Sequence, residues 1–352
     1  MSRLLTTFKK LVSIDSPTGH EQAVADFLID HFTQRNIIVE RDHTGNVFAK
    51  IYGFGEPVFL ASHMDTVEPG RNIIPVVKDD IITAYGDTVL GADNKSTLAV
   101  LLEVIERLKE KKHRPLEILF TVGEESTDPG AATFDYTKVT AKRGLVADIA
   151  LPVGTIVIGS PAYARFDIVI TGKSGHAAFP EKATNVIPVL GSIFSEVTTG
   201  KLDEQTILNI GTVTAGSVRN AVPGTATLRG EIRSFDENVL QKQLELFFEK
   251  VKTAARKFAV QLDIDYSVDN PTYLFEKQDQ YVQQISYVFQ QQDIQPTLVK
   301  SWSVSDANIF NTKGLQVINI GDGARNTHTR DESIALADME KLVTLFQLVC
   351  QQ

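Results

Sequence analysis

The chain has 352 residues, of which 43% are apolar and 22% are charged, and its formal net charge is −9 at pH 7. This length exceeds that of an average domain, and the composition is ordinary for a globular protein. Acidic residues outnumber basic ones and no basic block occurs, which argues against nucleic acid or an anionic membrane as a partner. Cys350 is the single cysteine, which excludes an intrachain disulfide and a metal site built from several thiolates.

No stretch approaches the ~18 consecutive apolar residues that a membrane-spanning helix needs. The first 15 residues carry apolar side chains at helical spacing, interrupted by Arg3, Lys9 and Lys10, a pattern unlike that of a secretory signal. We therefore expect a cytoplasmic protein without a membrane partner.

Residues 1–160 alternate between helical and strand patterns. Helices are predicted at 2–13, 19–34 and 94–112, and strands at 37–40, 47–52, 57–61, 116–122 and 144–149. A polar loop is expected between the strand at 57–61 and the helix at 94–112. The apolar runs at 57–61 and 116–122 are typical of buried strands. The alternation predicts an α/β fold with a mixed, largely parallel sheet flanked by helices.

A different pattern begins near residue 161, where apolar and polar residues alternate with a period of two. It is clear at 166–170, 226–232 and 262–266 and predicts half-exposed antiparallel strands. With helices at 185–198 and 237–259, the order becomes that of a ferredoxin-like α+β domain. The first pattern returns near 272, with helices at 278–291 and 336–350 and strands at 296–300 and 315–321. We therefore predict a catalytic domain of residues 1–160 and 272–352, with residues 161–271 inserted as a second domain.

Residue types that bind metal ions follow the predicted strands. They are His63 and Asp65, then Glu124 and Glu125, then Asp148, and finally His328, while Asp93 begins a helix. In open α/β sheets, ligands bind beyond the carboxyl ends of the strands. Singly, Asp93 would be a helix cap and the His63–Asp65 pair a surface loop. Two adjacent glutamates repel each other unless a cation or proton intervenes, which suits one metal ligand and one general base. Together these residues predict a metal-dependent hydrolase.

Three motifs resemble those of one family. Ser-His-Met-Asp-Thr-Val at 62–67 resembles its first zinc motif, Gly-Ala-Asp-Asn-Lys at 91–95 its bridging-aspartate motif, and Thr-Val-Gly-Glu-Glu at 121–125 its base-plus-ligand motif. The family is that of the co-catalytic zinc peptidases, which include tripeptide aminopeptidase (peptidase T), aminoacylases and glutamate carboxypeptidases. The resemblance covers nearly the whole chain and includes the inserted domain.

The resemblance implies two Zn²⁺ ions per subunit, although Mn²⁺ and Co²⁺ also suit histidine and carboxylate ligands. The implied ligands are Asp93 as the bridge, His63 and Asp148 at one ion, and Glu125 and His328 at the other. Glu124 would be the general base, and Asp65 would orient His63.

In the inserted domain, Gly175-His176-Ala177 resembles the motif whose histidine stabilises the tetrahedral intermediate, often from the partner subunit. Asn220 and Arg233 match positions that hold a substrate carboxylate, for which an arginine is well suited. From the residues alone, a histidine in a loop of Gly, Ser and Ala such as that of His176 is more often a mere surface residue, and Arg233 could equally form a salt bridge on a strand face. The open edges of the inserted sheet and the resemblance both predict a homodimer through this domain. A monomer with charged edges is the alternative.

The most similar branch is that of the tripeptidase-like aminopeptidases, because Asp148 rather than a glutamate is typical of it. The sequence Ile-Ala-Leu-Pro at 149–152 departs from the small residues usual there, which predicts an altered pocket. The expected function is hydrolysis of short peptides by a metal-activated water. The alternatives are an N-acyl-amino-acid deacylase or carboxypeptidase and, in another class, a non-catalytic binding protein on the same scaffold.

Overall fold

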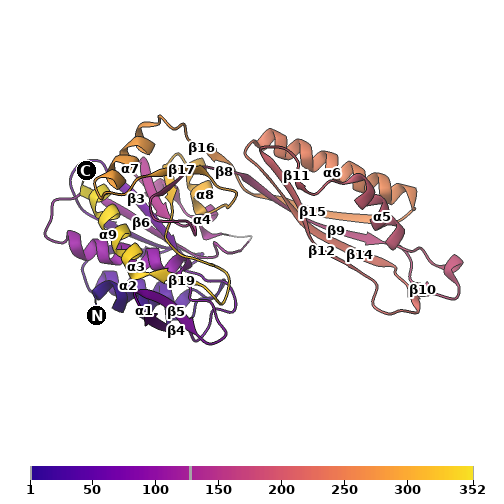
Figure 1. Cartoon of the computed structure of the whole chain (residues 1–352), viewed down its shortest axis with the longest axis horizontal. Helices are drawn as coiled ribbons and strands as arrows, with labels where there is room; N and C mark the ends of the chain where they lie inside the picture. Colours follow the sequence, from indigo (N-terminus) through magenta and orange to yellow (C-terminus); the bar gives the residue numbers. More distant parts are fainter. Residues whose placement is uncertain (1, 127–128, 352) are drawn as a thin grey trace. The chain divides into compact units, whose positions relative to one another are not determined.

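The computed structural model describes residues 2–126 and 129–351. The chain forms two compact units, of which unit 1 comprises Met1–Gly159 and Phe275–Gln352, and unit 2 comprises Ser160–Leu274. The indigo N-terminal and yellow C-terminal parts of the chain both belong to unit 1, whereas unit 2 is one continuous segment (Figure 1). The inserted segment expected from the sequence was residues 161–271, whereas unit 2 runs from Ser160 to Leu274.

Unit 1 is built on a mixed central sheet. Its strands are, in spatial order, β1 (Ile38–Arg41), β2 (Val47–Ile51), β6 (Leu116–Thr121), β3 (Val58–His63), β7 (Arg143–Ala147), β18 (Gln316–Ile320) and β8 (Thr155–Ser160), and β17 (Thr297–Lys300) pairs with β8. The inner pairs β3–β6, β3–β7 and β7–β18 are parallel. Every residue of β3 and β6 is buried, as their apolar runs predict. The predicted α/β class with a largely parallel centre is confirmed.

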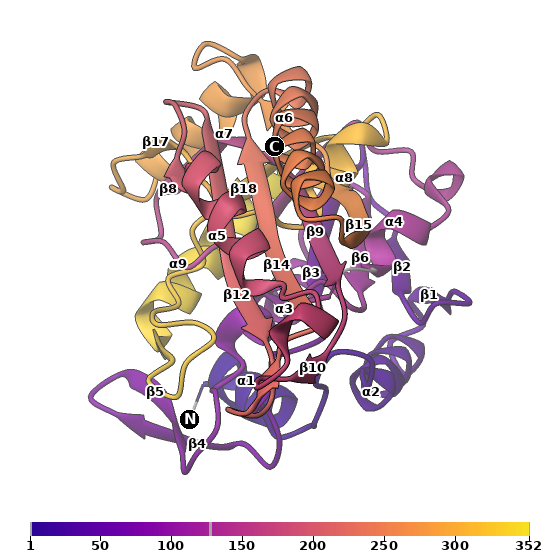
Figure 2. The same ribbon diagram turned by 90° about the vertical axis from the view of Figure 1, so that its right-hand side faces the viewer.

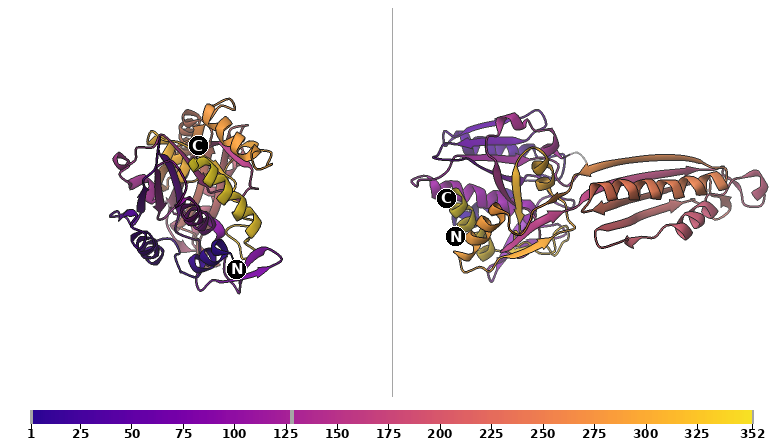
Figure 3. Two further views of the ribbon diagram at one scale, coloured as in Figure 1. Left: turned by 90° about the vertical axis from the view of Figure 1, so that its left-hand side faces the viewer. Right: turned by 90° about the horizontal axis from the view of Figure 1, so that it is seen from above.

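Helices flank this sheet. They are α1 (Arg3–Val12), α2 (Gln22–Thr33), α3 (Ala92–Leu108), α7 (Gln280–Gln290) and α9 (Leu336–Gln351), with the shorter α4 (Gly130–Thr133), η1 (Tyr136–Lys138) and α8 (Asp306–Thr312). Helix α3 contacts β3, α1 and α9, and almost all of its residues are buried. Helix α9, yellow in Figure 3, lies on the outside of unit 1. The core is rich in fully buried aromatic rings, such as Phe8, Phe32, Phe120, Phe289 and Phe346.

The expected polar loop between β3 and α3 contains an unpredicted hairpin. Its strands are β4 (Ile74–Lys78) and β5 (Ile81–Tyr85), and β19 (Ser333–Ala335) adds a third strand beside β5. The turn is formed by Asp79 and Asp80, both with positive φ angles of 49° and 69°. Four of the five β4 residues are exposed, so the alternation that marks half-buried strands is missing there. Strand β8, whose six residues are all buried, and helix α8, which has only seven residues, were also not predicted.

Unit 2 has the predicted ferredoxin-like order. Its main elements are β9 (Ala162–Thr171), α5 (Ile187–Glu196), β12 (Thr206–Ala215), β14 (Thr225–Ser234), α6 (Glu237–Lys257) and β15 (Gln261–Asn270). The antiparallel sheet has the order β12, β14, β9, β15, with β11 (Gly200–Lys201) beside β12. Figure 2 shows α5 and α6 on one face of it. Short elements complete the chain: β10 (Gly175–His176), η2 (Pro180–Lys182), β13 (Ala221–Val222) and β16 (Tyr273–Leu274).

The inward face of the unit 2 sheet is apolar. Leu228 lies opposite Ile168, which in turn lies opposite Ile264, and the first two are fully buried. Phe166 stacks on Phe247 of α6, with 4.6 Å between ring centroids. Unit 2 therefore has an apolar core of its own. Across the two described stretches, 2–126 and 129–351, no helix has the length and apolarity needed to cross a membrane.

Candidate metal centre

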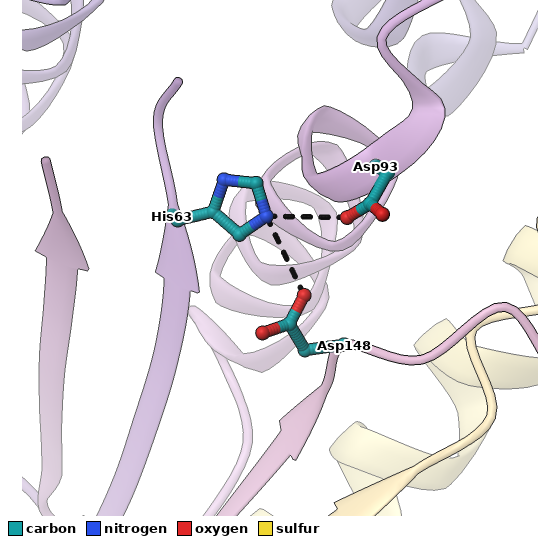
Figure 4. Close-up of side chains that lie close together, drawn as sticks. All are labelled: His63, Asp93 and Asp148. Carbon is teal, nitrogen blue, oxygen red and sulfur yellow. Dashed lines mark hydrogen bonds and ion pairs between the residues drawn. The ribbon is translucent and has the colours of Figure 1, made fainter. Parts of the chain in front are cut away.

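Three parallel strands bring acidic and imidazole side chains to one edge of the central sheet. His63 is the last residue of β3, Asp148 follows the last residue of β7, and Glu124 lies three residues after the end of β6. Because β3 runs parallel to both neighbours, these carboxyl ends meet at the same edge. Figure 4 shows the imidazole of His63 facing the carboxylates of Asp93 and Asp148. The distances from His63 Nε2 are 3.1 Å to Asp93 Oδ1 and 3.5 Å to Asp148 Oδ1.

Asp93 reaches this edge from the start of α3. Gly91 precedes the helix with a φ of +69°, and a Cβ there would lie 2.9 Å from Thr66 Cγ2, so only glycine suits this turn. Asp93 itself departs from helical geometry (φ −78°, ψ 107°). Its carboxylate faces the two histidines, with Oδ1 towards His63 and Oδ2 3.5 Å from His328 Nε2. The Asp93 side chain therefore lies among potential metal ligands. A residue that only capped the helix would not need to face two histidines.

His328 approaches from a loop between β18 and β19. Its φ is 62°, and its Nε2 lies 2.7 Å from Glu125 Oε1. The side chain of His328 is 49% exposed, whereas that of His63 is 1% exposed. Asp93 thus lies between a buried histidine on a strand and a half-exposed histidine on a loop.

These side chains form overlapping groups whose ligand atoms lie within 4.8 Å of one another. The groups are His63, Asp93 and Asp148; Asp93, Glu125 and His328; and His63, Glu124 and Glu125. The first two share Asp93, whose two oxygens point to different histidines, so the arrangement fits two cations with a bridging carboxylate. Imidazole nitrogen with carboxylate oxygen is a donor set that suits Zn²⁺, Mn²⁺ or Co²⁺. The third group contains Glu124 and Glu125 together, so either could approach a cation beside His63.

Asp65 supports several of these residues at once. Its Oδ1 lies 3.2 Å from His63 Nδ1, which leaves Nε2 free for a cation. The same carboxylate accepts hydrogen bonds from the backbone N–H groups of Glu124 and Glu125, each at 3.1 Å, and from the Thr18 hydroxyl at 2.9 Å. The sequence predicted that Asp65 orients His63, but its contacts with the backbone of both glutamates were not foreseen.

Two asparagines hold Asp148, and neither was predicted. Asn94 donates to Asp148 Oδ1 at 2.9 Å, and Asn319 donates to the Asp148 carbonyl at 2.9 Å while accepting from its N–H at 3.0 Å. Glu21 similarly accepts from the N–H of Gly123, directly before the two glutamates, at 3.1 Å. Asn94 lies within a recognised motif, and Asn319 is a polar residue inside an apolar strand, which was the available signal. Glu21 carried no such signal.

The centre concentrates negative charge in a buried space. Burial, with the nearby charge of Asp148, raises the pKa of Glu124 well above its ordinary value. Burial also raises the pKa of Asp148 and of Glu125. Hydrogen bonds with Asp93 and Glu125 raise the pKa of His328 to about 10. Such carboxylates cannot all be ionised together unless cations relieve their repulsion, and bound cations would displace the protons.

Two further buried acids lie near the centre and were not predicted. Asp306 accepts a 2.6 Å hydrogen bond from the Thr121 hydroxyl, and burial raises its pKa to about 7. Burial and the charge of Asp93 raise the pKa of Asp322 well above its ordinary value. Their raised pKa values reflect the carboxylates crowded around the site, and a bound cation would relieve this repulsion.

The three candidate residues of unit 2 fall into two places. Strand β10 pairs with β13, and the N–H of Ala177 donates to the Asn220 carbonyl at 2.9 Å, so His176 and Asn220 are neighbours. Asn220 lies five residues before β14 begins. Arg233 lies near the far end of β14, eight residues from the start of the strand, or roughly 26 Å along it. Its guanidinium pairs with Glu231 at 2.9 Å and lies over the Tyr163 ring. The predicted salt-bridge alternative for Arg233 is therefore present, and His176 is exposed.

Comparison with known proteins places these features in a family. The sequence pattern of peptidase family M20/M25/M40 matches residues 59–352. The structure is similar to that of aminopeptidase PepT from Bacillus cereus, with 31% identity, a TM-score of 0.90 and coverage of 99% of this chain and 97% of that one. It is also similar to a tripeptidase from Staphylococcus aureus, with 30% identity, a TM-score of 0.94 and the same coverage. The Bacillus subtilis protein YqjE is 30% identical over 99% of this chain and 98% of its own length.

Proposed function

Because the chain belongs to peptidase family M20/M25/M40, we propose that it is a two-metal aminopeptidase that removes the N-terminal residue of short peptides. The observation that carries the proposal is the position of Asp93, with one carboxylate oxygen towards His63 and the other towards His328. Similarity to an aminopeptidase and a tripeptidase, each over 99% of this chain, supports the choice of substrate class.

Two cations, Zn²⁺ with Mn²⁺ or Co²⁺ as alternatives, would be held by the shared Asp93. His63 and Asp148 would complete one set of ligands, and Glu125 and His328 the other. When bound, such cations supply Lewis acidity and make a water molecule acidic enough to react near neutral pH. Asp65 keeps His63 Nε2 directed at the site, and Asn94 keeps the Asp148 carboxylate in place.

Glu124 is the proposed general base. Water attacking a peptide carbonyl must lose a proton, and the departing amine must gain one. The backbone of Glu124 is fixed by its hydrogen bond to Asp65, and its side chain lies in a group with His63 and Glu125. With cations bound, Glu124 would be ionised, so its carboxylate can take the proton from the water and pass it to the departing amine.

His176 is the proposed donor to the developing oxyanion. The backbone N–H of Ala178 donates to His176 Nδ1 at 3.0 Å, so the neutral ring carries its proton on Nε2. An exposed N–H donor of this kind can stabilise a tetrahedral intermediate, typically by ~3 kcal/mol. Asn220 lies beside it and is proposed to bind the substrate.

Arg233 is proposed to hold the substrate carboxylate after releasing Glu231. Because Arg233 lies far from His176 along β14, one short peptide can contact both only if they belong to different subunits. This supports the proposed homodimer through unit 2, which was expected from the sequence. A cytoplasmic location also stays a prediction.

Subunit complementation tests the shared site. A His176→Ala protein mixed with a Glu124→Ala protein should regain activity above either parent after subunit exchange, because some heterodimers then contain one intact site. Verified exchange without any gain would rule out His176 acting across the interface.

A paired substrate assay tests the proposed reaction. The metal-loaded enzyme should cleave a free tripeptide and lose activity on the same peptide carrying an N-acetyl group. Preference for the blocked substrate would instead identify a deacylase or carboxypeptidase. Release of no amine from a broad peptide library would favour the non-catalytic binding protein.

A further inference from the structure

The side chain of Glu332 joins two loops that are distant in sequence. The residue lies four positions after His328, directly before β19, and is 2% exposed. Its two carboxylate oxygens accept separate hydrogen bonds, from the N–H of Gly91 at 2.7 Å and from the N–H of Asp93 at 3.0 Å. The partners are 241 and 239 positions away along the chain. One carboxylate thus connects the loop of His328 to the backbone that carries Asp93.

We propose that Glu332 is a positioning residue for the metal centre, holding the bridging Asp93 in register with His328. The inference rests on the proposed function, because it assigns Asp93 and His328 to a shared pair of cations. Glu332 would touch neither cation nor substrate. Its effect would pass through the Gly91–Asp93 backbone, whose displacement would move a ligand that both cations share.

The start of α3 explains why a carboxylate is needed there. The first N–H groups of a helix have no partner within the helix, and Gly91 at this N-cap has no side chain to supply one. Glu332 supplies two acceptors for these two donors. A glutamine would supply one acceptor and turn an NH₂ group towards the other N–H. A buried donor would then face a donor.

The His328 loop is also closed at its base. Arg325 and Ser333 exchange two backbone hydrogen bonds, at 2.9 Å and 3.0 Å, and the N–H of Glu332 donates to the Thr329 carbonyl at 3.2 Å. Ser333 belongs to β19, which pairs with β5. Backbone pairing between Arg325 and Ser333 therefore closes the loop, and the Glu332 carboxylate ties its closed end to the Gly91–Asp93 backbone.

Glu117 provides a matched control within unit 1. It is 4% exposed, and its carboxylate also accepts two backbone hydrogen bonds, from Thr140 at 2.8 Å and Ala141 at 2.9 Å. It lies near the opposite end of β6 from Glu124. Both backbone bonds go to Oε2 of Glu117, whereas Oε1 accepts from the Thr140 hydroxyl at 2.8 Å and lies 3.4 Å from Lys50 Nζ. Glu117→Gln therefore removes a buried negative charge that holds backbone N–H groups, as Glu332→Gln does, but only the Glu332 change should affect the backbone of a metal ligand.

The experiment compares Glu332→Gln with Glu117→Gln as metal-free full-length proteins titrated with Zn²⁺ against a chromogenic chelator. Both changes should lower the thermal midpoint. Zn²⁺ affinity should fall about 10–100-fold in Glu332→Gln, as is usual for residues that support a ligand, and stay unchanged in Glu117→Gln. Unchanged affinity in Glu332→Gln, or an equal loss in both variants, would overturn the proposal.

Two measurements cover a Glu332→Gln protein that fails to fold. Glu332→Asp keeps both oxygens on a shorter side chain, and it should also bind Zn²⁺ more weakly than wild type. In the metal-free wild type, hydrogen exchange at the Gly91 and Asp93 amides should be slow, and fast exchange would refute the contact. A wild-type protein that binds no metal or cleaves no peptide would refute the proposed function instead, which separates the two failures.

Discussion

The two histidine sides of the candidate centre are built differently. His63 ends a buried central strand, and its two ring nitrogens face Asp65 and Asp93. His328 lies on a loop in a left-handed conformation, and half of its side chain is exposed. The first histidine is held by the sheet that forms the core of unit 1. The second is held by contacts between segments that meet only after the chain has folded.

This difference predicts that the two sides bind a cation with unequal affinity. The His63 side needs little rearrangement to accept a cation, because its ligands and their supporting hydrogen bonds are already in place. The His328 side must keep a half-exposed loop in position, which lowers its affinity. We therefore expect one tightly held cation and one more readily exchanged cation, with Asp93 common to both.

Replacing the shared residue should abolish the difference between the two sides. Asp93→Ala removes a ligand from both positions, so both cations should be lost and activity should fall to background. Metal analysis after gel filtration measures the stoichiometry. A variant that retained one full equivalent of metal would contradict the bridging role of Asp93.

Removing the proposed base should leave both sides intact. Glu124→Ala is expected to keep two cations and to lower kcat about 10²–10⁴-fold, because it removes proton transfer but no assigned ligand. The same metal analysis, combined with tripeptide kinetics, checks this. Equal metal loss in the Glu124→Ala and Glu125→Ala variants would show that the two glutamates do not have separate roles.

Replacing each histidine in turn should affect the stability of the fold unequally. His63→Ala should lose one cation and about 1–3 kcal/mol of unfolding free energy, because buried partners lose their hydrogen bonds. His328→Ala should also lose one cation but change stability by less than about 0.5 kcal/mol, as surface changes usually do. Urea unfolding of the metal-free variants measures this. Equal destabilisation would show that the two sides are equally integrated in the fold.

His31, which lies outside the metal centre, should make the stability of unit 1 depend on pH independently of the metal-centre residues. In α2, burial, followed by the charge of Arg35, lowers the pKa of His31 to about 4. Its Nε2 is buried and has no hydrogen-bond partner among the described residues. The unfolded chain binds a proton at this residue below its ordinary pKa of 6.5, whereas the folded protein stays neutral down to about pH 4.

Stability should therefore fall as pH decreases between about 6.5 and 4, and this part should be absent in His31→Leu. The expected size is about 1–2 kcal/mol, reduced for partial solvent exposure. The difference in unfolding free energy between wild type and variant removes the contribution of the metal-centre residues, which both proteins share. A difference that did not vary with pH would contradict a neutral buried His31.

Sequence reasoning succeeded where periodic patterns were strong. The apolar run before His63 predicted a buried strand, and the alternation at 166–170 predicted an antiparallel sheet. The residues of the three overlapping ligand groups were all candidates, because most of them are a histidine or carboxylate after a predicted strand and Asp93 lies in a recognised motif. Their assigned roles as ligands and base remain proposals.

The supporting residues were harder to predict because they act through backbone groups. Glu21 and Glu332 meet their partners across long sequence separations, and no local pattern marks them. The strand at 74–78 escaped prediction because most of its side chains are exposed. His176 and Arg233 both looked suited to substrate binding, and only the course of β14 reveals how far apart they lie.

The insertion of unit 2 within unit 1 has a consequence for biosynthesis. Unit 2 is continuous, so it can fold as soon as Leu274 has been made, whereas unit 1 must wait for β18 and the loop that follows it. Domains usually fold in the order in which they emerge from the ribosome. Here the domain that begins first is completed last, and contacts such as Gly91 with Glu332 span 241 positions. A nascent chain would therefore carry a finished unit 2 before it could assemble a metal centre, which delays hydrolytic activity until late in translation.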